Sequence, residues 1–424
     1  MSGTDAGDRL NLVLFAPRVN WAGLGRIVSD VSCRLPESVR QTIVLFGGKP
    51  VFPLGGPVRT LGADSRKQLP VKGLRLFLNA MKFRKILKEL KPVAVLVFHH
   101  DARAVNLLAQ ISLPRLRCRT IVVALDVPTQ YRKYFAGSRD RLHNILIYCI
   151  MRHAHRIIAT AEGVKADLVA GFKAQSQKID VIYASVDSEK IRQMSLEAVE
   201  HSWFSDNVPL VVASGRFVFQ KNQADLLKAF AMALREKPCR LVLIGDGPER
   251  DALSRLVSDL GLSDHVLFLG YQPNPFKFIA RSGVFAFTSL FDAQPLALLE
   301  TMALGCPIVA YDCPGGTREM LAPGTKASAD LDGFEEAEYG LLVPTGKVET
   351  FAKAIVRVLD DPQMRARYSR LGRERAAQFS MEDMADNYLR VIRTVATTRV
   401  LAPGSKFRRF MGCVVTGRTT ASMP

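Results

Sequence analysis

From residue 210 to residue 310, short apolar runs alternate with longer amphipathic segments, and this alternation limits the fold more than any other feature. Runs of four or five apolar residues favour strands, and the segments between them favour helices. Such alternation predicts an α/β fold with a parallel, doubly wound sheet. The expected strands are 210–214, 240–244, 265–269, 284–288 and 307–310, and the expected helices are 222–236, 248–260, 275–281 and 296–304.

The first half repeats this pattern less regularly. A chain of 424 residues is too long for one ordinary core, so we expect two domains, 1–190 and 205–380. The polar stretch 188–207 is the expected boundary between them. Strands are expected within 11–17, 41–46, 58–61, 92–98, 119–128, 157–163, 179–187 and 341–344, and helices within 27–35, 71–90, 348–360, 363–378 and 381–397.

Two carboxylates lie at and just before the expected helix 296–304. Pro295 suits the first turn of this helix. Asp292 precedes the helix, and its carboxylate can accept hydrogen bonds from the free backbone N–H groups of the first turn. Glu300 lies eight positions later, on roughly the same helical face. A helix start beside two carboxylates suits a polar, anionic ligand such as a sugar nucleotide. An acidic N-cap and a solvated glutamate explain the same residues equally well.

Glycines and cations follow two other strands. Gly215 and Arg216 follow strand 210–214, and Lys221 precedes the next helix. Asp246 and Gly247 follow strand 240–244, and this turn has no third glycine, so it is not a dinucleotide fingerprint.

Together, the segments 211–225, 241–250, 289–310 and 312–319 resemble the donor-binding half of glycosyltransferase family 4, retaining enzymes of the GT-B fold. The resemblance is strong from about residue 210 to 394 and weaker in the first half. It implies two Rossmann-like domains facing a cleft, and a helix over 381–397 that crosses back to the first domain. It also implies sugar transfer from a nucleotide-diphosphate donor without a metal or other cofactor.

The resemblance implies roles for individual residues. Arg216 and Lys221 would stabilise the leaving diphosphate, which fixed cations can do without a metal. Asp292 would lie near the hydroxyls and reactive carbon of the donor sugar, and Glu300 would accept hydrogen bonds from the ribose. The remaining expected donor-binding residues are Gly23, Gly215, Asp246, Gly247, Ala293 and Leu296.

The chain departs from the family pattern at several of these positions. Asp292 replaces a glutamate, and Ala293 stands where glycine is usual. Gly23 is the one glycine kept of a pair that would approach a phosphate, and Asp126 lacks the histidine found before it in many relatives. These departures leave donor preference and acceptor chemistry open.

The expected strand 92–98 ends in His99, His100 and Asp101. In the family, a histidine near this point faces the acceptor or the donor sugar, so His100 is a candidate catalytic residue. Adjacent histidines are expected to point in different directions, so at most one would serve. No metal-ligand set is expected.

The net charge of +18 is concentrated in the first half. Residues 1–200 hold 31 basic and 16 acidic side chains, 31 − 16 = +15, and residues 201–424 hold 27 and 24, 27 − 24 = +3. The basic helix 71–90 suits an anionic membrane surface, although a solvated face over a core stripe explains it too. The basic tail 398–424 is expected to be disordered or lipid-touching. Zinc-finger and RNA-binding signatures are absent from the sequence, so no nucleic-acid partner is expected.

Other features bear on the compartment. The seven cysteines have no C-x-x-C spacing, the N-terminus has no basic signal-peptide pattern, and no apolar run approaches the ~20 residues of a membrane span. We therefore expect a cytoplasmic protein, peripheral at the inner face of the membrane. The acidic loop 323–339 is expected to be a mobile flap or disordered.

The expected function is retaining transfer from a nucleotide-sugar donor, UDP-linked first and GDP-linked next, to a lipid-linked or saccharide acceptor in polysaccharide or lipopolysaccharide assembly. One alternative is a sucrose-type synthase with a small soluble acceptor. Another is a non-catalytic binding subunit, which Asp292, Ala293 and the missing histidine would favour.

Overall fold

The computed structural model describes residues 9–19, 23–62, 72–111, 118–135, 140–326 and 333–397. The chain divides into two compact units. The first comprises 1–123, 149–157 and 388–424, and the second comprises 124–148 and 158–387. The predicted domain boundaries remain a prediction, and the predicted tail 398–424 lies outside the described residues.

The first sheet has seven strands in the order β3-β2-β1-β4-β5-β6-β7. The pairings from β3 to β5 are parallel, as expected for strands joined by helical crossovers. Its strands are β1 (Leu10–Ala16), β2 (Val39–Leu45), β3 (Val58–Thr60), β4 (Ala94–Phe98), β5 (Arg119–Ala124), β6 (Arg156–Ala159) and β7 (Ile179–Val181). The helices of this half are α1 (Gly23–Arg34), α2 (Lys72–Leu90), α3 (His100–Ile111), α4 (Pro128–Phe135), α5 (Asp140–His153), α6 (Glu162–Phe172) and α7 (Ser188–Ser195).

The second sheet also has seven strands, in the order β10-β9-β8-β11-β12-β14-β13. Only the pairing of β13 with β14 is antiparallel among the pairings of the described strands in this sheet. Its strands are β8 (Leu210–Ser214), β9 (Arg240–Ile244), β10 (Val266–Gly270), β11 (Val284–Phe287), β12 (Ile308–Asp312), β13 (Glu335–Glu336) and β14 (Leu341–Pro344). The helices of the second half of the sequence are α8 (Gln223–Glu236), α9 (Arg250–Asp259), α10 (Phe276–Ile279), α11 (Leu296–Leu304), α12 (Thr317–Leu321), α13 (Val348–Asp360), α14 (Pro362–Ala377) and α15 (Met381–Thr397). From residue 388 on, α15 belongs to the first unit.

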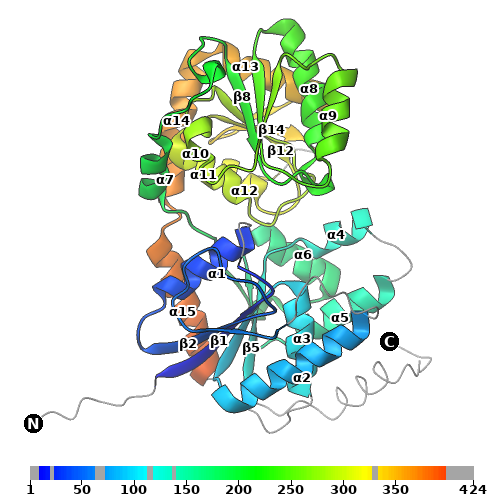
Figure 1. Cartoon of the computed structure of the whole chain (residues 1–424), viewed down its shortest axis with the longest axis vertical. Helices are drawn as coiled ribbons and strands as arrows, with labels where there is room; N and C mark the ends of the chain where they lie inside the picture. Colours follow the sequence, from blue (N-terminus) through cyan, green and yellow to red (C-terminus); the bar gives the residue numbers. More distant parts are fainter. Residues whose placement is uncertain are drawn as a thin grey trace, which may run out of the picture. The chain divides into compact units, whose positions relative to one another are not determined.

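Helices cover both faces of the second sheet. In Figure 1, α8 and α9 lie on one side of it, and α10 and α11 lie on the other. The order of the strands reverses between β8 and β11, which are neighbours in the sheet although β9 and β10 separate them in sequence. Open α/β sheets bind ligands at such a reversal, beyond the carboxyl ends of the strands.

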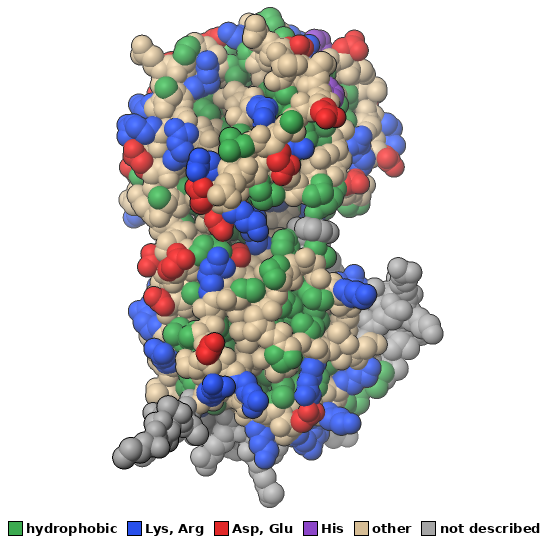
Figure 2. All heavy atoms as spheres, turned by 60° about the vertical axis from the view of Figure 1, so that its left-hand side comes forward, with side chains coloured by type: hydrophobic (Ala, Val, Ile, Leu, Met, Phe, Trp, Pro, Cys, Tyr) green, Lys and Arg blue, Asp and Glu red, His purple; other side chains and the backbone are tan. Residues whose placement is uncertain are grey.

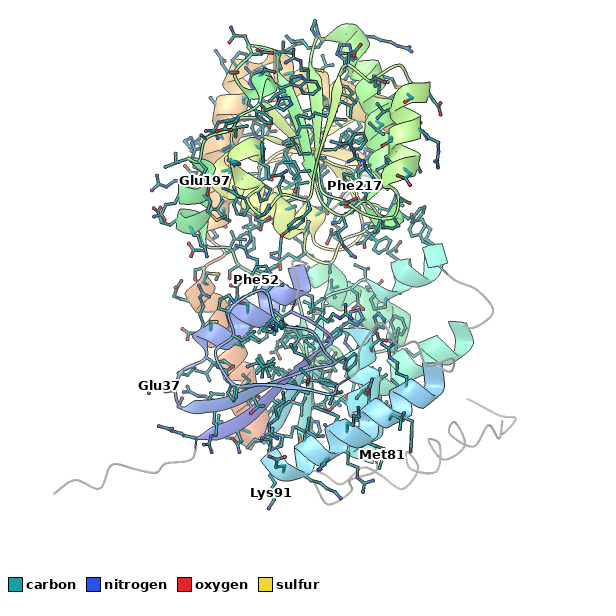
Figure 3. The ribbon with its side chains drawn as sticks, in the orientation of Figure 1. Glu37, Phe52, Met81, Lys91, Glu197 and Phe217 are labelled. Atoms are coloured by element: carbon teal, nitrogen blue, oxygen red, sulfur yellow. The ribbon has the colours of Figure 1, made fainter. Side chains whose placement is uncertain are left out.

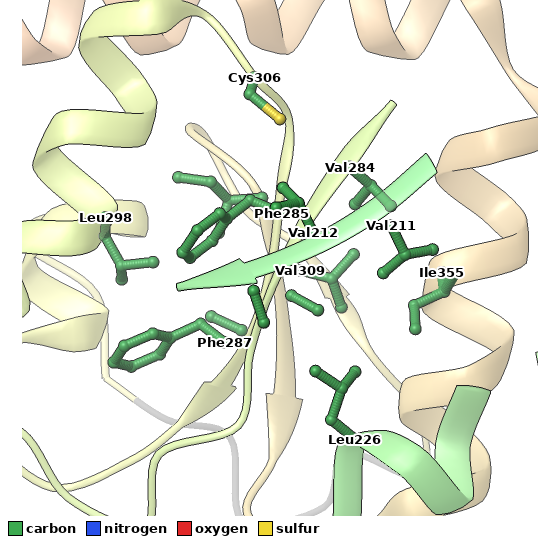
Figure 4. Packing of buried hydrophobic residues seen from close by; sticks show 14 of the residues in the cluster. Val211, Val212, Leu226, Val284, Phe285, Phe287, Leu298, Cys306, Val309 and Ile355 are labelled. Atoms are coloured by element: carbon green, nitrogen blue, oxygen red, sulfur yellow. The ribbon is translucent and has the colours of Figure 1, made fainter. Parts of the chain in front are cut away.

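Side chains of the second sheet alternate between its two faces. Phe285 and Phe287 point toward Leu298 of α11, while Val284 points to the opposite face, where Ile355 of α13 packs (Figure 4). All five are buried. Because both faces are covered, β8, β9 and β11 are almost continuously apolar rather than alternating.

Charged and apolar side chains both reach the surface. Lys and Arg side chains are spread over the face drawn in Figure 2 and gather around its lower end. On α2, Phe77, Leu78 and Met81 are exposed, and Figure 3 labels Met81. In the part of the chain that the structure describes, no helix is both long enough and apolar enough to cross a membrane.

Two expectations about local structure were wrong. Helix α1 begins at Gly23, four residues before the expected start, so Gly23 lies in the first helical turn rather than in a preceding loop. In the expected acidic flap, Glu335 and Glu336 form strand β13, because pairing with β14 satisfies their backbone. Residues 327–332 of that loop lie outside the described residues.

Candidate functional site

Hydrogen bonds connect two loops at the carboxyl edge of the second sheet. One follows β8 and contains residues 215–222, and the other follows β11 and contains residues 288–295. The side chain of Gln220 donates to the carbonyl of Phe291 at 2.8 Å, and the backbone N–H of Leu290 donates to the carbonyl of Gln220 at 2.8 Å. The hydroxyl of Thr288 lies 3.0 Å from the carbonyl oxygen of Asn222, to which it donates. These bonds hold the two loops at a fixed separation.

Lys221 and Asp292 meet across these two loops. The ammonium group of Lys221 pairs with the carboxylate of Asp292 and lies 5.2 Å from the ring centroid of Phe287. The side chains are only 22% and 14% exposed. An ion pair so poorly hydrated is less screened than a surface pair, so each charge depends on the other.

Asp292 is held by its backbone as well. Its N–H donates to the carbonyl of Pro314 at 3.0 Å, and its own carbonyl accepts from Gly316 at 3.0 Å. The expectation that Asp292 caps the following helix was wrong. The N-cap of α11 is Pro295, no side chain caps it, and the carboxylate of Asp292 is instead paired with Lys221. Asp292 is not helical, so the helical-face argument that linked it to Glu300 fails as well.

Arg216 directly follows Gly215 at the end of β8 and is exposed. Its carbonyl accepts from the side-chain amide of Gln223 at 3.0 Å, which fixes the turn. Within the described ranges, no carboxylate lies within ion-pairing distance of its guanidinium group. Arg216 therefore presents an unneutralised fork of N–H donors, the geometry that suits phosphate oxygens.

Glycines let the neighbouring loops approach closely. The N–H of Gly215 donates to the carbonyl of Ile244 at 2.9 Å, and that of Phe217 donates to the carbonyl of Asp246 at 2.9 Å. A Cβ at Gly245 would lie 1.9 Å from the carbonyl oxygen of Gly215, and one at Gly247 would lie 2.3 Å from that of Phe217. Only glycine fits at these two positions, so the turn after β9 supports the turn that carries Arg216.

The other expected donor-binding residues lie nearby in sequence and fold. Asp246 is exposed, and its carboxylate accepts from the N–H of Gly247 at 2.7 Å. Ala293 is buried, Leu296 is the first residue of α11, and Glu300 lies in the second turn of that helix, half-buried. The structure thus brings Lys221 and Asp292 into contact and places the rest on the loops and helix that follow β8, β9 and β11.

A small pocket beneath this edge was not predicted. It has about 20 Å³ of space, enough for one water molecule, and includes Ser214, Lys221, Gln223 and Ser289 in its lining. The hydroxyl of Ser289 and the side-chain carbonyl of Gln223 are buried there, and neither has a hydrogen-bond partner among the described residues. A buried water would satisfy both groups. No local sequence pattern indicates this pocket, because its lining comes from segments far apart in the chain.

The remaining two candidate residues belong to the first unit. Gly23 is the first residue of α1 and is exposed, and His100 is the first residue of α3, directly beyond the carboxyl end of β4. The expectation that His99 and His100 point in different directions was wrong. Their ring centroids lie 3.8 Å apart, because His99 has a left-handed backbone (φ 74°) that turns its side chain beside that of His100.

Two family descriptions match the chain. "Glycosyl transferases group 1" matches residues 197–375, and "Glycosyltransferase Family 4" matches residues 21–190. The chain is 28% identical over 384 residues to an N-acetylgalactosaminyltransferase of Campylobacter jejuni whose name gives a diphospho-undecaprenol-linked saccharide as its substrate; the match covers 90% of this chain and 99% of the relative.

Two other proteins are similar over different extents. The lipopolysaccharide core biosynthesis glycosyltransferase LpsE of Rhizobium meliloti is 34% identical over 187 residues, which cover 44% of this chain and 50% of LpsE. The structure of HepE from Anabaena, solved in complex with UDP-glucose, matches with a TM-score of 0.71 at 18% identity, covering 91% of this chain and 100% of HepE. At this identity the structural match supports the fold alone.

Proposed function

Because the chain belongs to glycosyltransferase family 4 and has the GT-B fold, we propose that it is a retaining hexosyltransferase with a UDP-sugar donor and a lipid-linked or saccharide acceptor. The observation that carries the proposal is the group formed by exposed Arg216 and the Lys221–Asp292 pair at the carboxyl edge of the second sheet. Transfer from a nucleotide-diphosphate sugar releases a diphosphate, and fixed cations at this edge stabilise the charge that develops on it.

Arg216 and Lys221 have different roles in this proposal. Arg216 has no carboxylate partner in the described part of the chain, so it offers a net positive charge and two parallel N–H groups to a phosphate. The charge of Lys221 is already balanced by Asp292. An ammonium group has three N–H donors, so Lys221 can keep its bond to Asp292 and donate another to the diphosphate. The two cations supply the charge that a metal would otherwise supply, so we propose that this step needs no metal.

The sugar and the ribose would meet the carboxylates. We propose that Asp292 lies near the hydroxyls and reactive carbon of the donor sugar, and that Glu300 accepts hydrogen bonds from the ribose. Asp292 serves two groups in this arrangement, since it also orients Lys221. Gly215, Asp246, Gly247, Ala293 and Leu296 form the surrounding donor-binding backbone. The acceptor hydroxyl attacks on the face that the diphosphate leaves, so the anomeric configuration is retained.

A lipid-linked acceptor is supported by helix α2. Phe77, Leu78 and Met81 are 57%, 42% and 44% exposed, which is unusual for three large apolar side chains within five positions of one helix. Arg75, Lys82, Lys85 and Lys88 are exposed on the same helix. Apolar side chains flanked by cations suit the headgroup region of an anionic bilayer. The Campylobacter relative, whose named substrate is lipid-linked, supports the same choice.

The donor is tested by two measurements on the full chain. Thermal unfolding is followed with UDP, GDP, ADP and their sugars, since a ligand of the folded state raises the melting temperature. The proposal predicts the largest rise with UDP compounds. Transfer from the best donor into undecaprenol-diphosphate-linked saccharides is then followed by mass spectrometry, and the new anomeric centre is assigned by NMR. Absence of any nucleotide-dependent rise, or an inverted product, would contradict the proposal.

The membrane surface is tested by sedimentation with vesicles. The protein should bind vesicles rich in anionic lipid and should be released by high salt. Phe77→Ser with Met81→Ser should weaken this binding, whereas Leu196→Ser should not, although Leu196 is 72% exposed. Equal vesicle binding by the unmodified protein, the double variant and Leu196→Ser would contradict the proposed role of α2.

A further inference from the structure

His99, His100 and Asp101 bring three potential metal ligands together in the first unit. One ligand atom from each side chain lies within 4.8 Å of those of the other two. Nε2 of His100 lies 3.6 Å from Oδ1 of Asp101. Two ligands of a tetrahedral Zn²⁺, each about 2.0 Å from the metal, are about 3.3 Å apart. Small side-chain rotations would therefore close the three atoms around one ion.

The backbone of His99 creates this convergence. In an extended strand, neighbouring side chains point to opposite faces. His99 leaves β4 with φ 74°, a conformation that residues other than glycine seldom adopt. As a result its ring lies beside that of His100, 3.8 Å between centroids with a 33° tilt. Strained backbone of this kind persists where the surrounding structure enforces it, which is most often at functional sites.

The nitrogen and oxygen atoms of these three side chains suit a transition metal. The backbone N–H of Asp101 faces Nδ1 of His99 at 3.4 Å, so this nitrogen presents a lone pair. That distance exceeds the usual 2.7–3.2 Å of an N–H···O or N–H···N bond, so the contact is weak and a metal would replace it readily. Two imidazoles and one carboxylate form a donor set that zinc and other first-row transition metals prefer, whereas Mg²⁺ and Ca²⁺ prefer oxygen ligands.

We infer that His99, His100 and Asp101 form a binding site for one divalent transition-metal ion, with Zn²⁺ as the favoured occupant. The site supplies three protein ligands, so at least one coordination position stays open to water or to a ligand. The N-terminus of α3 lies at the site and disfavours a cation by about two- to fivefold in affinity. The negative charge of Asp101 offsets this effect. The inference rests on the geometry of His99, His100 and Asp101 and not on the proposed transferase reaction.

Titration with Co²⁺, a coloured substitute for Zn²⁺, tests the inference on the full chain. Cys33 is exposed and Cys413 lies outside the described residues, so both are replaced by serine in every protein used. The expected result is one equivalent of Co²⁺ per chain, with an absorption spectrum of nitrogen and oxygen ligands, displaced by Zn²⁺. His100→Ala and Asp101→Asn should each weaken binding about tenfold or more.

Two further variants make the test specific. His99→Asn removes a ligand while tolerating the left-handed backbone, so it should also weaken binding without unfolding the chain. His265→Ala removes a histidine of the second unit and should leave the affinity unchanged. Binding of less than one equivalent, or equal affinities for His265→Ala and the three ligand variants, would overturn the inference.

Discussion

Replacing Gly245 with alanine tests whether backbone contact between two turns holds Arg216 in place. The new Cβ would lie 1.9 Å from the carbonyl oxygen of Gly215, whereas real contacts of this kind are not shorter than 3.0 Å. One of the two turns must therefore move by at least 3.0 − 1.9 = 1.1 Å. Both atoms belong to backbone or lie directly on it, so no side-chain rotation relieves the clash.

The cost in stability has two sources. Gly245 has φ +137°, and an alanine forced into such a conformation costs about 1–3 kcal/mol. The clash between the new Cβ and the carbonyl oxygen of Gly215 adds about 1–3 kcal/mol. The free energy of unfolding should therefore fall by about 2–6 kcal/mol. Displacement of the Arg216 turn by about 1 Å should also lower donor turnover by about 100-fold.

Gly261→Ala is the matched control. Gly261 also has a positive φ, +67°, but apart from its chain neighbours no atom of the described residues lies within 4 Å of the position of its Cβ. Only the backbone term remains, about 1–2 kcal/mol, and turnover should be unchanged. Urea unfolding and donor turnover are measured for both variants. If Gly245→Ala is no more destabilising than Gly261→Ala, the turns do not support each other as described.

Three further predictions concern charge and protonation. Lys221→Met and Asp292→Asn should be non-additive in the free energy of unfolding by about 1–3 kcal/mol, since the two side chains are in contact and mostly buried; additivity within about 0.5 kcal/mol would show that they are uncoupled. Arg318→Ala should lower the free energy of unfolding by about 3 kcal/mol, because it leaves the carboxylates of Asp312 and Glu335, at 2.6 and 2.8 Å, without their mostly buried partner. Arg370→Ala breaks an exposed pair and should cost less than about 1 kcal/mol. Similar costs for both variants would contradict this prediction. Burial raises the pKa of Cys118 and of Cys313 to about 12. Above about pH 8.5 the folded state therefore keeps protons that the unfolded state loses. The free energy of unfolding should fall by up to about 1.4 kcal/mol per pH unit for each thiol. Reduced protein unfolded in urea at several pH values between 7.5 and 9.5 should show this slope, and replacing both cysteines with alanine should reduce it; an unchanged slope would refute the assignment.

The alternation of strands and helices was sufficient to predict most of the second sheet. The expected bounds 210–214, 240–244 and 296–304 agree with β8, β9 and α11. In the first half, helices α3 to α7 were not predicted. Helix α7 lies in the stretch that was expected to be a polar boundary. It was missed because it has few apolar residues: one face buries Ile191, and the other face is charged.

The candidate site was predicted in residues but not in contacts. Lys221 and Asp292 were assigned to different partners, and no local pattern indicates a pair separated by 71 positions. The capping prediction for Asp292 failed because tertiary contact with Lys221 outweighs a local hydrogen bond. The left-handed backbone at His99 was also beyond the sequence, since residues other than glycine adopt it too seldom for a local pattern to indicate it.

The most direct test of the central claim compares donor turnover in Arg216→Gln and Arg235→Gln. Both arginines are exposed, but Arg235 lies in the last turn of α8, away from the carboxyl edge of the sheet. If Arg216 stabilises the leaving diphosphate, kcat should fall by about 100-fold or more in Arg216→Gln and stay unchanged in Arg235→Gln. Turnover in Arg216→Gln within about threefold of the unmodified protein would contradict the claim.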